Sequence, residues 1–495
     1  MENITLSKTF DKVSPITGNN LGPFPAMDRE EVNVLAEQAR KAQSVWGELA
    51  VKERLVHIKL MRKFLARNLD RFSRIIHEDN GKTLCDAITS EFILCLDIMK
   101  YYEKRASGFL KPQNRSLPVY LFGMKGTVFY EPVGVVGIIG PWNYPFQLVF
   151  IPIISALIAG NSVLVKHSSA APMTGKILEE TAEAGELPPH VFNVIWGKGI
   201  SGQYLSEAPI DKLFFTGSTN IGKNLAKLAA EKLIPVSLEL GGKDPLLVMD
   251  DADLVQAAKG AVWGSLFNSG QTCVSVERVY VTEKNYDDFV KLLEVEISKV
   301  KTGKKETDDM GAMTTEDQFN EVESQIADAV QKGARLISGG GQNKEPGGFF
   351  HDPVLLVDCT QEMKIIQEET FGPVVAVVKT KDEEQAVEYA NDSKYGLSST
   401  IFTRDRNKGY STAKKIKAGC VGINAPLFPF TASSMPFGGI KESGMGRYHG
   451  REGLFCFCNA KSVVYNGFWK KRHFSWYPYR RIYRMYLKLA RFWYG

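Results

Sequence analysis

The stretch VGVVGIIG at residues 133–140 decides the fold of this 495-residue chain. It is a short apolar run without polar alternation, closed by a glycine and followed by a segment long enough for a helix. Four later stretches repeat this pattern: NSVLVKHS (161–168), VFNVIWG (191–197), KLFFTGS (212–218) and PVSLELGG (235–242). Apolar strands with helix-sized connections predict an α/β fold whose parallel sheet is covered by helices on both faces.

A second set of apolar runs predicts a second α/β unit. Its members are PLLVMDD (245–251), ERVYVTE (277–283), PVLLVDC (353–359) and PVVAVVKT (373–380). Residues 28–107 differ, because their apolar residues recur at helical spacing. We place the boundary between the two units near 241–270, and a chain of this length is expected to form two or three domains.

The composition is that of a folded globular protein, with 44% hydrophobic and 24% charged residues. No apolar run reaches the roughly 18–20 residues of a membrane-spanning helix, and the first twelve residues lack the pattern of a secretory signal. Seven cysteines cannot all pair within one chain, which favours the reducing cytoplasm. No nearby His or Cys pair joins Cys456 and Cys458, so we expect no metal site.

The positive charge is concentrated in the tail, residues 468–495. This segment holds eight Lys and Arg without Asp or Glu, and subtracting them from the net charge of +5 leaves about −3 elsewhere. From Tyr479 onward, apolar residues recur at helical spacing against basic ones. We predict an amphipathic helix on an anionic membrane surface, with Trp469, Trp476 and Trp493 at headgroup depth. The alternative roles for the tail are subunit packing, nucleic-acid contact and a disordered arm. For the protein as a whole, we expect no nucleic-acid partner.

Three short segments carry candidate chemistry. NSGQTCVSVER (268–278) places Cys273 after small residues that allow close backbone approach to a ligand, although most lone cysteines are inert buried residues. Glu239 ends an apolar strand before two glycines, where it is either a capping group or a general base. Asn143, between two prolines, is either a turn residue or an amide donor to an oxyanion.

Taken together, these segments resemble the aldehyde dehydrogenase superfamily over residues 10–467. The motifs that carry the resemblance are PWNYP (141–145), FTGST (215–219) with Gly222, LELGGK (238–243), GQTC (270–273), EETFGPV (368–374) and MPFGGIKESGMGR (435–447). SGMGRYHG (443–450) is similar to the branch that contains class 3 and fatty aldehyde dehydrogenases.

The resemblance implies a Rossmann-like NAD(P)-binding domain, a second α/β catalytic domain and a small bridging β element for oligomerisation, in a homodimer or homotetramer. The expected boundaries are 1–109 and 133–240 for the NAD(P)-binding domain, 241–440 for the catalytic domain, 110–132 and 441–467 for the bridging segments, and 468–495 for the tail.

The resemblance also assigns catalytic roles. Cys273 is the nucleophile, Asn143 and the Cys273 backbone N–H form the oxyanion hole, and Glu239 is the general base that hydrolyses a thioester intermediate. The product is then a free carboxylic acid. A coenzyme A-acylating enzyme is one alternative, which Glu239 disfavours, and a catalytically retired membrane-binding structural protein is another.

For the cofactor, the resemblance implies that Lys166 binds the adenosine ribose and Glu369 the nicotinamide ribose. Phe371 and Trp142 lie nearby, while Gly217 and Ser218 precede a helix whose amides face the pyrophosphate. Relatives that prefer NAD often carry K-P-S-E where this chain has Lys166, His167, Ser168 and Ser169. Replacing that glutamate by Ser169 removes a repulsion of the 2′-phosphate, so NADP is expected to be tolerated or preferred.

The expected substrate is a small apolar aldehyde, either aliphatic or aromatic. The residues expected to line its tunnel are Gln147, Leu148, Ile151, Thr272, Val274, residues 425–430 and Phe437. They are mostly apolar and include no Arg that could pair with a carboxylate substrate. We expect the enzyme in the cytoplasm, with its tail on the membrane surface.

Overall fold

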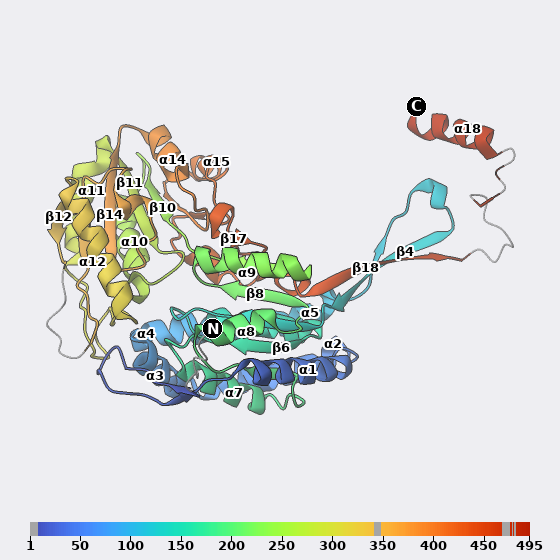
Figure 1. The fold of residues 1–495 in the computed structure, drawn as a ribbon. Helices are drawn as coiled ribbons and strands as arrows, with labels where there is room; N and C mark the ends of the chain where they lie inside the picture. Colours follow the sequence, from blue (N-terminus) through green and yellow to red (C-terminus); the bar gives the residue numbers. More distant parts are fainter. Residues whose placement is uncertain (1–7, 341–347, 468–475, 478, 480–481) are drawn as a thin grey trace. The chain divides into compact units, whose positions relative to one another are not determined.

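The computed structural model describes residues 8–340, 348–467, 476–477, 479 and 482–495 (Figure 1). Of the predicted tail, residues 468–475, 478, 480 and 481 lie outside the described residues, and Trp469 with them. The chain forms two compact units. The larger comprises Met1–Leu110 and Glu131–Asn459, and the smaller comprises Lys111–Tyr130 and Ala460–Gly495.

A six-stranded sheet in the larger unit contains all five strands predicted within residues 133–242. Its order is β17-β9-β8-β5-β6-β7. The strands are β5 (Val135–Ile139), β6 (Ser162–Lys166), β7 (Phe192–Val194), β8 (Lys212–Thr216), β9 (Val236–Glu239) and β17 (Gly444–Met445). The first five run parallel, and β17 pairs antiparallel with β9. The predicted parallel sheet is confirmed, and β17 is an edge strand that the sequence did not predict.

Helices cover both faces of this sheet because its apolar strands are buried on both sides. One face carries α1 (Arg29–Trp46), α8 (Gly199–Glu207) and α9 (Thr219–Lys232). The other carries α6 (Gln147–Ala159) and α7 (Met173–Ala184), against which α2 (Val51–Arg67), α3 (Leu69–Asn80) and α5 (Leu94–Phe109) pack. The helical pattern of residues 28–107 is therefore confirmed, and between α3 and α5 it includes α4 (Leu84–Asp86) and a π-helical turn, η1 (Ala87–Ile93).

The strand order fixes where this sheet can hold a ligand. The chain adds β6 and β7 on one side of β5, then returns to add β8 and β9 on the other. In open parallel sheets, ligands bind beyond the carboxyl ends of the strands where the order reverses in this way. The turns after β5 and β8 are therefore the natural walls of a binding site.

A seven-stranded sheet forms the rest of the larger unit, in the order β12-β13-β14-β11-β10-β15-β16. Its strands are β10 (Asp244–Val248), β11 (Val276–Thr282), β12 (Arg335–Ser338), β13 (Val354–Val357), β14 (Val374–Thr380), β15 (Thr400–Phe402) and β16 (Gly422–Ile423). All neighbours are parallel except β12 and β13. The four strands predicted for a second α/β unit are β10, β11, β13 and β14.

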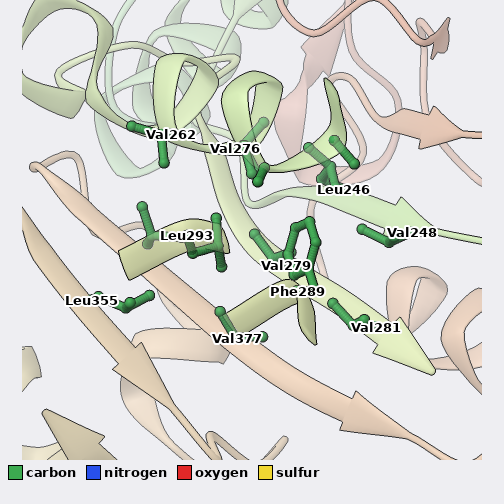
Figure 2. Packing of buried hydrophobic residues seen from close by; sticks show 14 of the residues in the cluster. Leu246, Val248, Val262, Val276, Val279, Val281, Phe289, Leu293, Leu355 and Val377 are labelled. Carbon is green, nitrogen blue, oxygen red and sulfur yellow. The ribbon is translucent and has the colours of Figure 1, made fainter. Parts of the chain in front are cut away.

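Two helices cover each face of the seven-stranded sheet: α10 (Leu254–Leu266) and α11 (Glu283–Ile297) on one, α12 (Glu316–Gln331) and α14 (Glu383–Asn391) on the other. Figure 2 shows Phe289 of α11 beside Val279 of β11, in the same cluster as Leu246 and Val377. The shorter elements are β1 (Thr9–Phe10), β2 (Phe24–Pro25), α13 (Lys364–Gln367), α15 (Arg406–Ala413), α16 (Phe428–Thr431) and α17 (Glu452–Phe455).

The smaller unit contains most of a three-stranded sheet and one helix. The sheet has the order β18-β4-β3 and consists of β3 (Gln113–Arg115), β4 (Met124–Pro132) and β18 (Cys458–Asn466). The helix is α18 (Ile482–Tyr494), which lies within the amphipathic stretch predicted from Tyr479 onward. Among the described residues, no helix is both long and apolar enough to cross a membrane.

The bridging segment predicted at residues 441–467 is shorter in the structure. Gly444 and Met445 pair with Glu239 and Leu238, so β17 completes the six-stranded sheet. Only from Cys458 onward does the chain enter the three-stranded sheet. β17 covers the free edge of β9, whose backbone groups would otherwise be unpaired. Residues 444–445 contain no apolar run from which this strand could have been predicted.

Candidate active site

Two cavities of the larger unit meet at Cys273, in the loop before β11. The apolar cavity measures about 320 Å³ and the sheet-edge cavity about 200 Å³, and both are lined by Cys273 and Leu148. The apolar cavity is lined by Cys85, Asp86, Thr89, Ser90, Leu94, Tyr144, Gln147, Leu148, Trp263, Phe267, Thr272, Cys273, Val274, Leu427, Phe428, Phe430 and Thr431. The sheet-edge cavity is lined by Pro141, Trp142, Asn143, Leu148, Thr216, Gly217, Ser218, Glu239, Leu240, Gly241, Cys273, Gln318, Glu321, Glu369 and Phe371.

The loop that carries Cys273 has an unusual backbone. Asn268, Ser269 and Gly270 adopt left-handed conformations with φ of 57°, 56° and 70°, which costs free energy for the two residues that carry a Cβ. Hydrogen bonds hold them there: the Asn268 side chain donates to the Gln271 carbonyl at 3.1 Å, and the Ser269 hydroxyl donates to the Gly311 carbonyl at 2.9 Å. A side chain at Gly270 would collide with the Gly372 carbonyl, 2.0 Å from its Cβ position. The loop is thus rigid where the thiol is presented.

Asn143 lies in the turn after β5 and is buried. Its Nδ2 donates to the Gln271 carbonyl at 3.0 Å, which brings the predicted oxyanion-hole amide to the loop of Cys273. An amide carries two N–H groups, so the second is available to an oxygen in the sheet-edge cavity that Asn143 lines.

Glu239 ends β9 and is almost completely buried. Its Oε2 accepts no hydrogen bond from the protein. Burial raises the pKa of this carboxyl well above its usual range, and the positive charge of Arg447 opposes the shift only in part. A carboxyl with a raised pKa that lines a cavity can exchange a proton with a water bound there.

Burial also raises the pKa of the Cys273 thiol, and the nearby carboxylates of Asp244, Glu369 and Glu239 raise it further. Each negative charge disfavours the thiolate. The thiol is therefore protonated at neutral pH in this state, so a nucleophilic role requires a base.

The cofactor residues predicted around the sheet-edge cavity are brought together. Trp142, Gly217, Ser218, Glu369 and Phe371 all line it. The rings of Trp142 and Phe371 meet edge to face at 5.4 Å, and Glu369 accepts the Gly242 N–H at 3.0 Å. Burial and the neighbouring Glu277 raise the pKa of Glu369 to about 8.

The residues present fit a dinucleotide in this cavity. Thr216 Oγ1 and Glu239 Oε2 are buried without a protein partner, and both residues line the cavity. Ser218, at the N-cap of α9, makes no side-chain cap, which leaves the first amides of this helix available to phosphate oxygens. Polar groups and a helix N-terminus at the carboxyl edge of a parallel sheet suit a ribose and a pyrophosphate.

Two residues that the sequence did not predict hold the turn of Glu369. Glu277 on β11 accepts the backbone N–H groups of Thr370 at 2.8 Å and Phe371 at 2.9 Å. Lys243 forms a buried ion pair with Glu277 at 2.7 Å. Lys243 stands in the LELGGK motif, but no sequence signal linked it to Glu277.

Lys166 and Ser169 are not among the residues that line the sheet-edge cavity. Lys166 ends β6 and donates through Nζ to the His167 carbonyl at 2.7 Å, and burial lowers its pKa to about 8. Ser169 is half-buried in the turn that follows. Both stay predictions as cofactor contacts.

The predicted substrate tunnel is partly corrected. Gln147, Leu148, Thr272, Val274 and several residues of 425–430 line the apolar cavity, but Ile151 and Phe437 do not. Ile151 is buried inside α6, whose whole circumference is covered, and Phe437 packs against Phe430 and Tyr448. The residues that sequence reasoning missed lie on remote helices: Cys85, Asp86, Thr89, Ser90, Leu94, Trp263 and Phe267.

A half-buried thiol between two cavities, one apolar and one at the edge of a parallel sheet, suits an enzyme that forms a covalent intermediate beside a dinucleotide. Comparisons with known proteins define the class further. A family model described as "Aldehyde dehydrogenase family" matches residues 3–463. The chain therefore belongs to the aldehyde dehydrogenase family, as its motifs predicted.

Individual relatives agree with this assignment. A 4,4'-diapolycopene aldehyde oxidase of Methylomonas sp is 37% identical, over 95% of this chain and 88% of its own length. The NADP(+)-dependent succinate-semialdehyde dehydrogenase GabD of Escherichia coli is 34% identical, over 90% and 92%. A solved Mycobacterium tuberculosis aldehyde dehydrogenase complexed with NAD+ superposes with a TM-score of 0.89 at 33% identity, over 94% of this chain and 96% of that one.

The raised pKa of Cys273 predicts how its alkylation depends on pH. We expect the rate with iodoacetamide to rise about tenfold for each pH unit from about 7 to about 9, because the thiolate fraction below the pKa grows in that proportion. Mass spectrometry of the peptide that contains Cys273 measures the rate, and the Cys273→Ala protein gives the background from the other cysteines. A rate that stays constant over this range contradicts the raised pKa.

Proposed function

We propose that this enzyme oxidises an apolar aldehyde to the carboxylic acid with NAD(P)+ as the hydride acceptor, through a thiohemiacetal and a thioester on Cys273. The observation that carries the proposal is the position of Cys273 in the walls of both cavities. One cavity holds the aldehyde and the other the nicotinamide, so the thiol lies between the two reactants.

The residues around Cys273 account for addition to the carbonyl. The Cys273 thiol gives up its proton to a water in the sheet-edge cavity that it lines, and this proton leaves to the solvent. The sulfur adds to the carbonyl carbon, and the oxyanion accepts hydrogen bonds from Asn143 Nδ2 and the Cys273 backbone N–H. Removal of one such donor in enzymes of this kind costs about 3–4 kcal/mol of transition-state stabilisation. NAD(P)+, when bound, supplies the acceptor for the hydride that leaves the tetrahedral adduct.

Hydrolysis of the thioester requires a base that faces water. Glu239 has an unpartnered Oε2 in the sheet-edge cavity. Once the carboxyl has ionised, this oxygen can accept the proton of a water that attacks the thioester carbonyl. The C–S bond of the thioester then breaks, the acid leaves, and the proton that Glu239 took from the water passes to the sulfur of Cys273. This role for Glu239 favours a free acid over transfer of the acyl group to coenzyme A.

The lining of the apolar cavity supports an uncharged substrate. Trp263, Phe267, Phe428 and Leu427 form much of its wall, and none of the lining residues is a Lys or Arg. Asp86 also lines this cavity; burial raises the pKa of its carboxyl only to about 6, so at neutral pH it adds a negative charge. A substrate carboxylate would be buried there without a cation, which is unfavourable. The diapolycopene aldehyde named for one relative is a substrate of the apolar kind.

The tail supports a site of action at a membrane surface. α18 exposes large apolar side chains, among them Tyr483, Phe492 and Trp493, and it carries Arg484, Lys488 and Arg491 without any acidic residue. A short helix with aromatic and basic faces binds the interface of anionic bilayers. We propose that this helix brings the enzyme to lipid-derived aldehydes.

We also propose a homodimer or homotetramer built through the three-stranded sheet. β18 exposes Val463, Val464 and Tyr465, each by 40% or more. A small sheet with exposed apolar residues is stabilised by a second copy. Light scattering of the full chain tests this, and a monomer would refute it.

The Glu239→Gln variant tests the hydrolytic mechanism. We expect one burst of NAD(P)H per active site, after which turnover falls by about 10²–10⁴-fold, because the thioester forms but no base activates water. Stopped-flow absorbance of NAD(P)H measures the burst, and Cys273→Ala should show none. Undiminished steady-state turnover in Glu239→Gln would rule out this role.

The charge of the apolar cavity predicts substrate preference. We expect kcat/KM for decanal to exceed that for succinate semialdehyde by at least about 100-fold, because only the second substrate buries a carboxylate without a partner. Initial rates with both aldehydes and both cofactors measure the ratio. A preference for succinate semialdehyde would refute the apolar substrate.

The Ser169→Glu variant tests cofactor choice. We expect the KM for NADP+ to rise at least about tenfold while that for NAD+ changes little, because the new carboxylate repels only the 2′-phosphate. Ser169→Ala, which adds no charge, is the matched control. Equal effects on both cofactors would show that Ser169 does not face the ribose.

Deletion of residues 468–495 tests the membrane proposal. We expect sedimentation with phosphatidylglycerol vesicles to fall at least about tenfold, because the basic and aromatic contacts are lost. The double variant Arg484→Glu/Lys488→Glu removes the charge attraction and keeps the helix length. Unchanged sedimentation of the truncated enzyme would refute the proposal.

A further inference from the structure

We infer that the buried ion pair of Lys82 and Glu91 positions the oxyanion hole, by fixing the turn that carries Asn143 to the loop that carries Cys273. The inference rests on the proposed function. Neither residue lines the apolar or the sheet-edge cavity, so both act as positioning residues and not as catalytic ones.

Lys82 contacts the turn from one side. Its Nζ lies 2.6 Å from Glu91 Oε1, and neither side chain is exposed to solvent. The same Nζ donates to the Asn143 carbonyl at 2.8 Å and lies 4.3 Å from the centre of the Tyr144 ring. A buried ammonium needs such partners for its donors, and two of them belong to the turn.

Glu91 contacts the other end of the same turn. Its Oε2 accepts the backbone N–H groups of Phe146 at 3.2 Å and Gln147 at 2.8 Å, which are the N-cap and first residue of α6. Phe146 has no capping side chain of its own. A carboxylate at a helix N-terminus satisfies free amides and stabilises the helix dipole. The pair therefore holds the turn from Asn143 to Gln147 at both ends.

The helix that carries Glu91 has an irregular geometry at this position. Residues Ala87–Ile93 form a π-helical turn between α4 and α5. Such turns are rare, are less stable than α-helix and are frequent at functional sites. The π-helical turn contains no proline or glycine that would explain its irregular geometry. It places Glu91 where one carboxylate meets both Lys82 and the start of α6.

The Asn143 carbonyl links the pair to the nucleophile loop. It accepts Lys82 Nζ at 2.8 Å and Asn268 Nδ2 at 3.2 Å, while the Asn143 side chain donates to the Gln271 carbonyl at 3.0 Å. Asn268 is the first of the left-handed residues before Cys273. Displacement of the Asn143 carbonyl would therefore move the amide donor relative to the sulfur, and this distance decides how well an oxyanion is stabilised.

The test uses the full-length enzyme and the double variant Lys82→Met/Glu91→Gln. It removes both charges of the pair together, and the side-chain amide introduced in place of Glu91 still offers an oxygen to the amides of α6. Asp86, whose pKa Lys82 lowers, keeps its hydrogen bond from the Asn268 backbone N–H. We expect kcat for decanal to fall about 10²-fold, the order of the loss of one oxyanion donor, with the Kd of the dinucleotide changed little. Hydrolysis of p-nitrophenyl acetate without dinucleotide should fall in parallel, because its tetrahedral intermediate uses the same hole.

A double-mutant cycle separates positioning from general stability. In an Asn143→Ala background, the Lys82 and Glu91 substitutions should lower kcat by less than about threefold, because the side chain that they position is absent. Full additivity of the two losses would overturn the inference. If the double variant does not fold, Glu91→Gln alone is placed in the same cycle with the same criterion.

Arg54→Met is the matched control for loss of a buried cation. Arg54 is 5% exposed and donates through Nε to the Ile158 carbonyl at 3.0 Å, at the opposite end of α6. Its loss should lower Tm and leave kcat within about twofold. An equal loss of kcat in this variant would show that α6 stability alone is responsible. A wild-type enzyme without aldehyde-dependent NAD(P)H formation would refute the proposed function instead.

Discussion

The low dielectric of the protein interior around Cys273 is the constraint on which the site depends. Burial is the first cause of the raised pKa of Cys273, Glu239 and Glu369. Burial disfavours the charged form of each group because a charge is poorly solvated in a medium of low dielectric. The same low dielectric strengthens any hydrogen bond to an oxyanion that forms beside Cys273. The same environment thus disfavours charge on the free side chains and favours hydrogen bonds to an oxyanion on the substrate carbonyl oxygen.

Where the structure does keep charges inside, it pairs them and uses them to hold turns. Lys82 with Glu91 fixes the turn after β5, and Lys243 with Glu277 fixes the turn of Glu369 and Phe371. Buried ion pairs add little net stability once desolvation is counted, but they specify one arrangement of the backbone groups that they bind. Both pairs bind main-chain atoms next to residues of the site. The two pairs therefore determine geometry more than free energy of folding.

The sequence predicted the elements whose signals are local. Apolar runs located nine strands, because strands buried on both faces need nearly continuous Val, Ile, Leu and Phe. The family and its fold are confirmed, and the residues that the motifs assigned to the cleft lie together in one cavity, apart from Lys166 and Ser169. Contacts between distant segments were not predictable: nothing local links Glu91 to residue 147, and a π-helical turn has no sequence signature. Ile151 was misplaced because α6 is apolar on every side, so periodicity could not show which face meets the cavity.

The covalent intermediate on Cys273 is the central claim, and acid quench of the enzyme during steady-state oxidation of decanal tests it most directly. After digestion, mass spectrometry should find part of the peptide 268–278 heavier by one decanoyl group in place of the thiol hydrogen, at Cys273 and at no other cysteine. An unmodified Cys273 peptide under turnover, or an acyl group on another residue, would contradict the account.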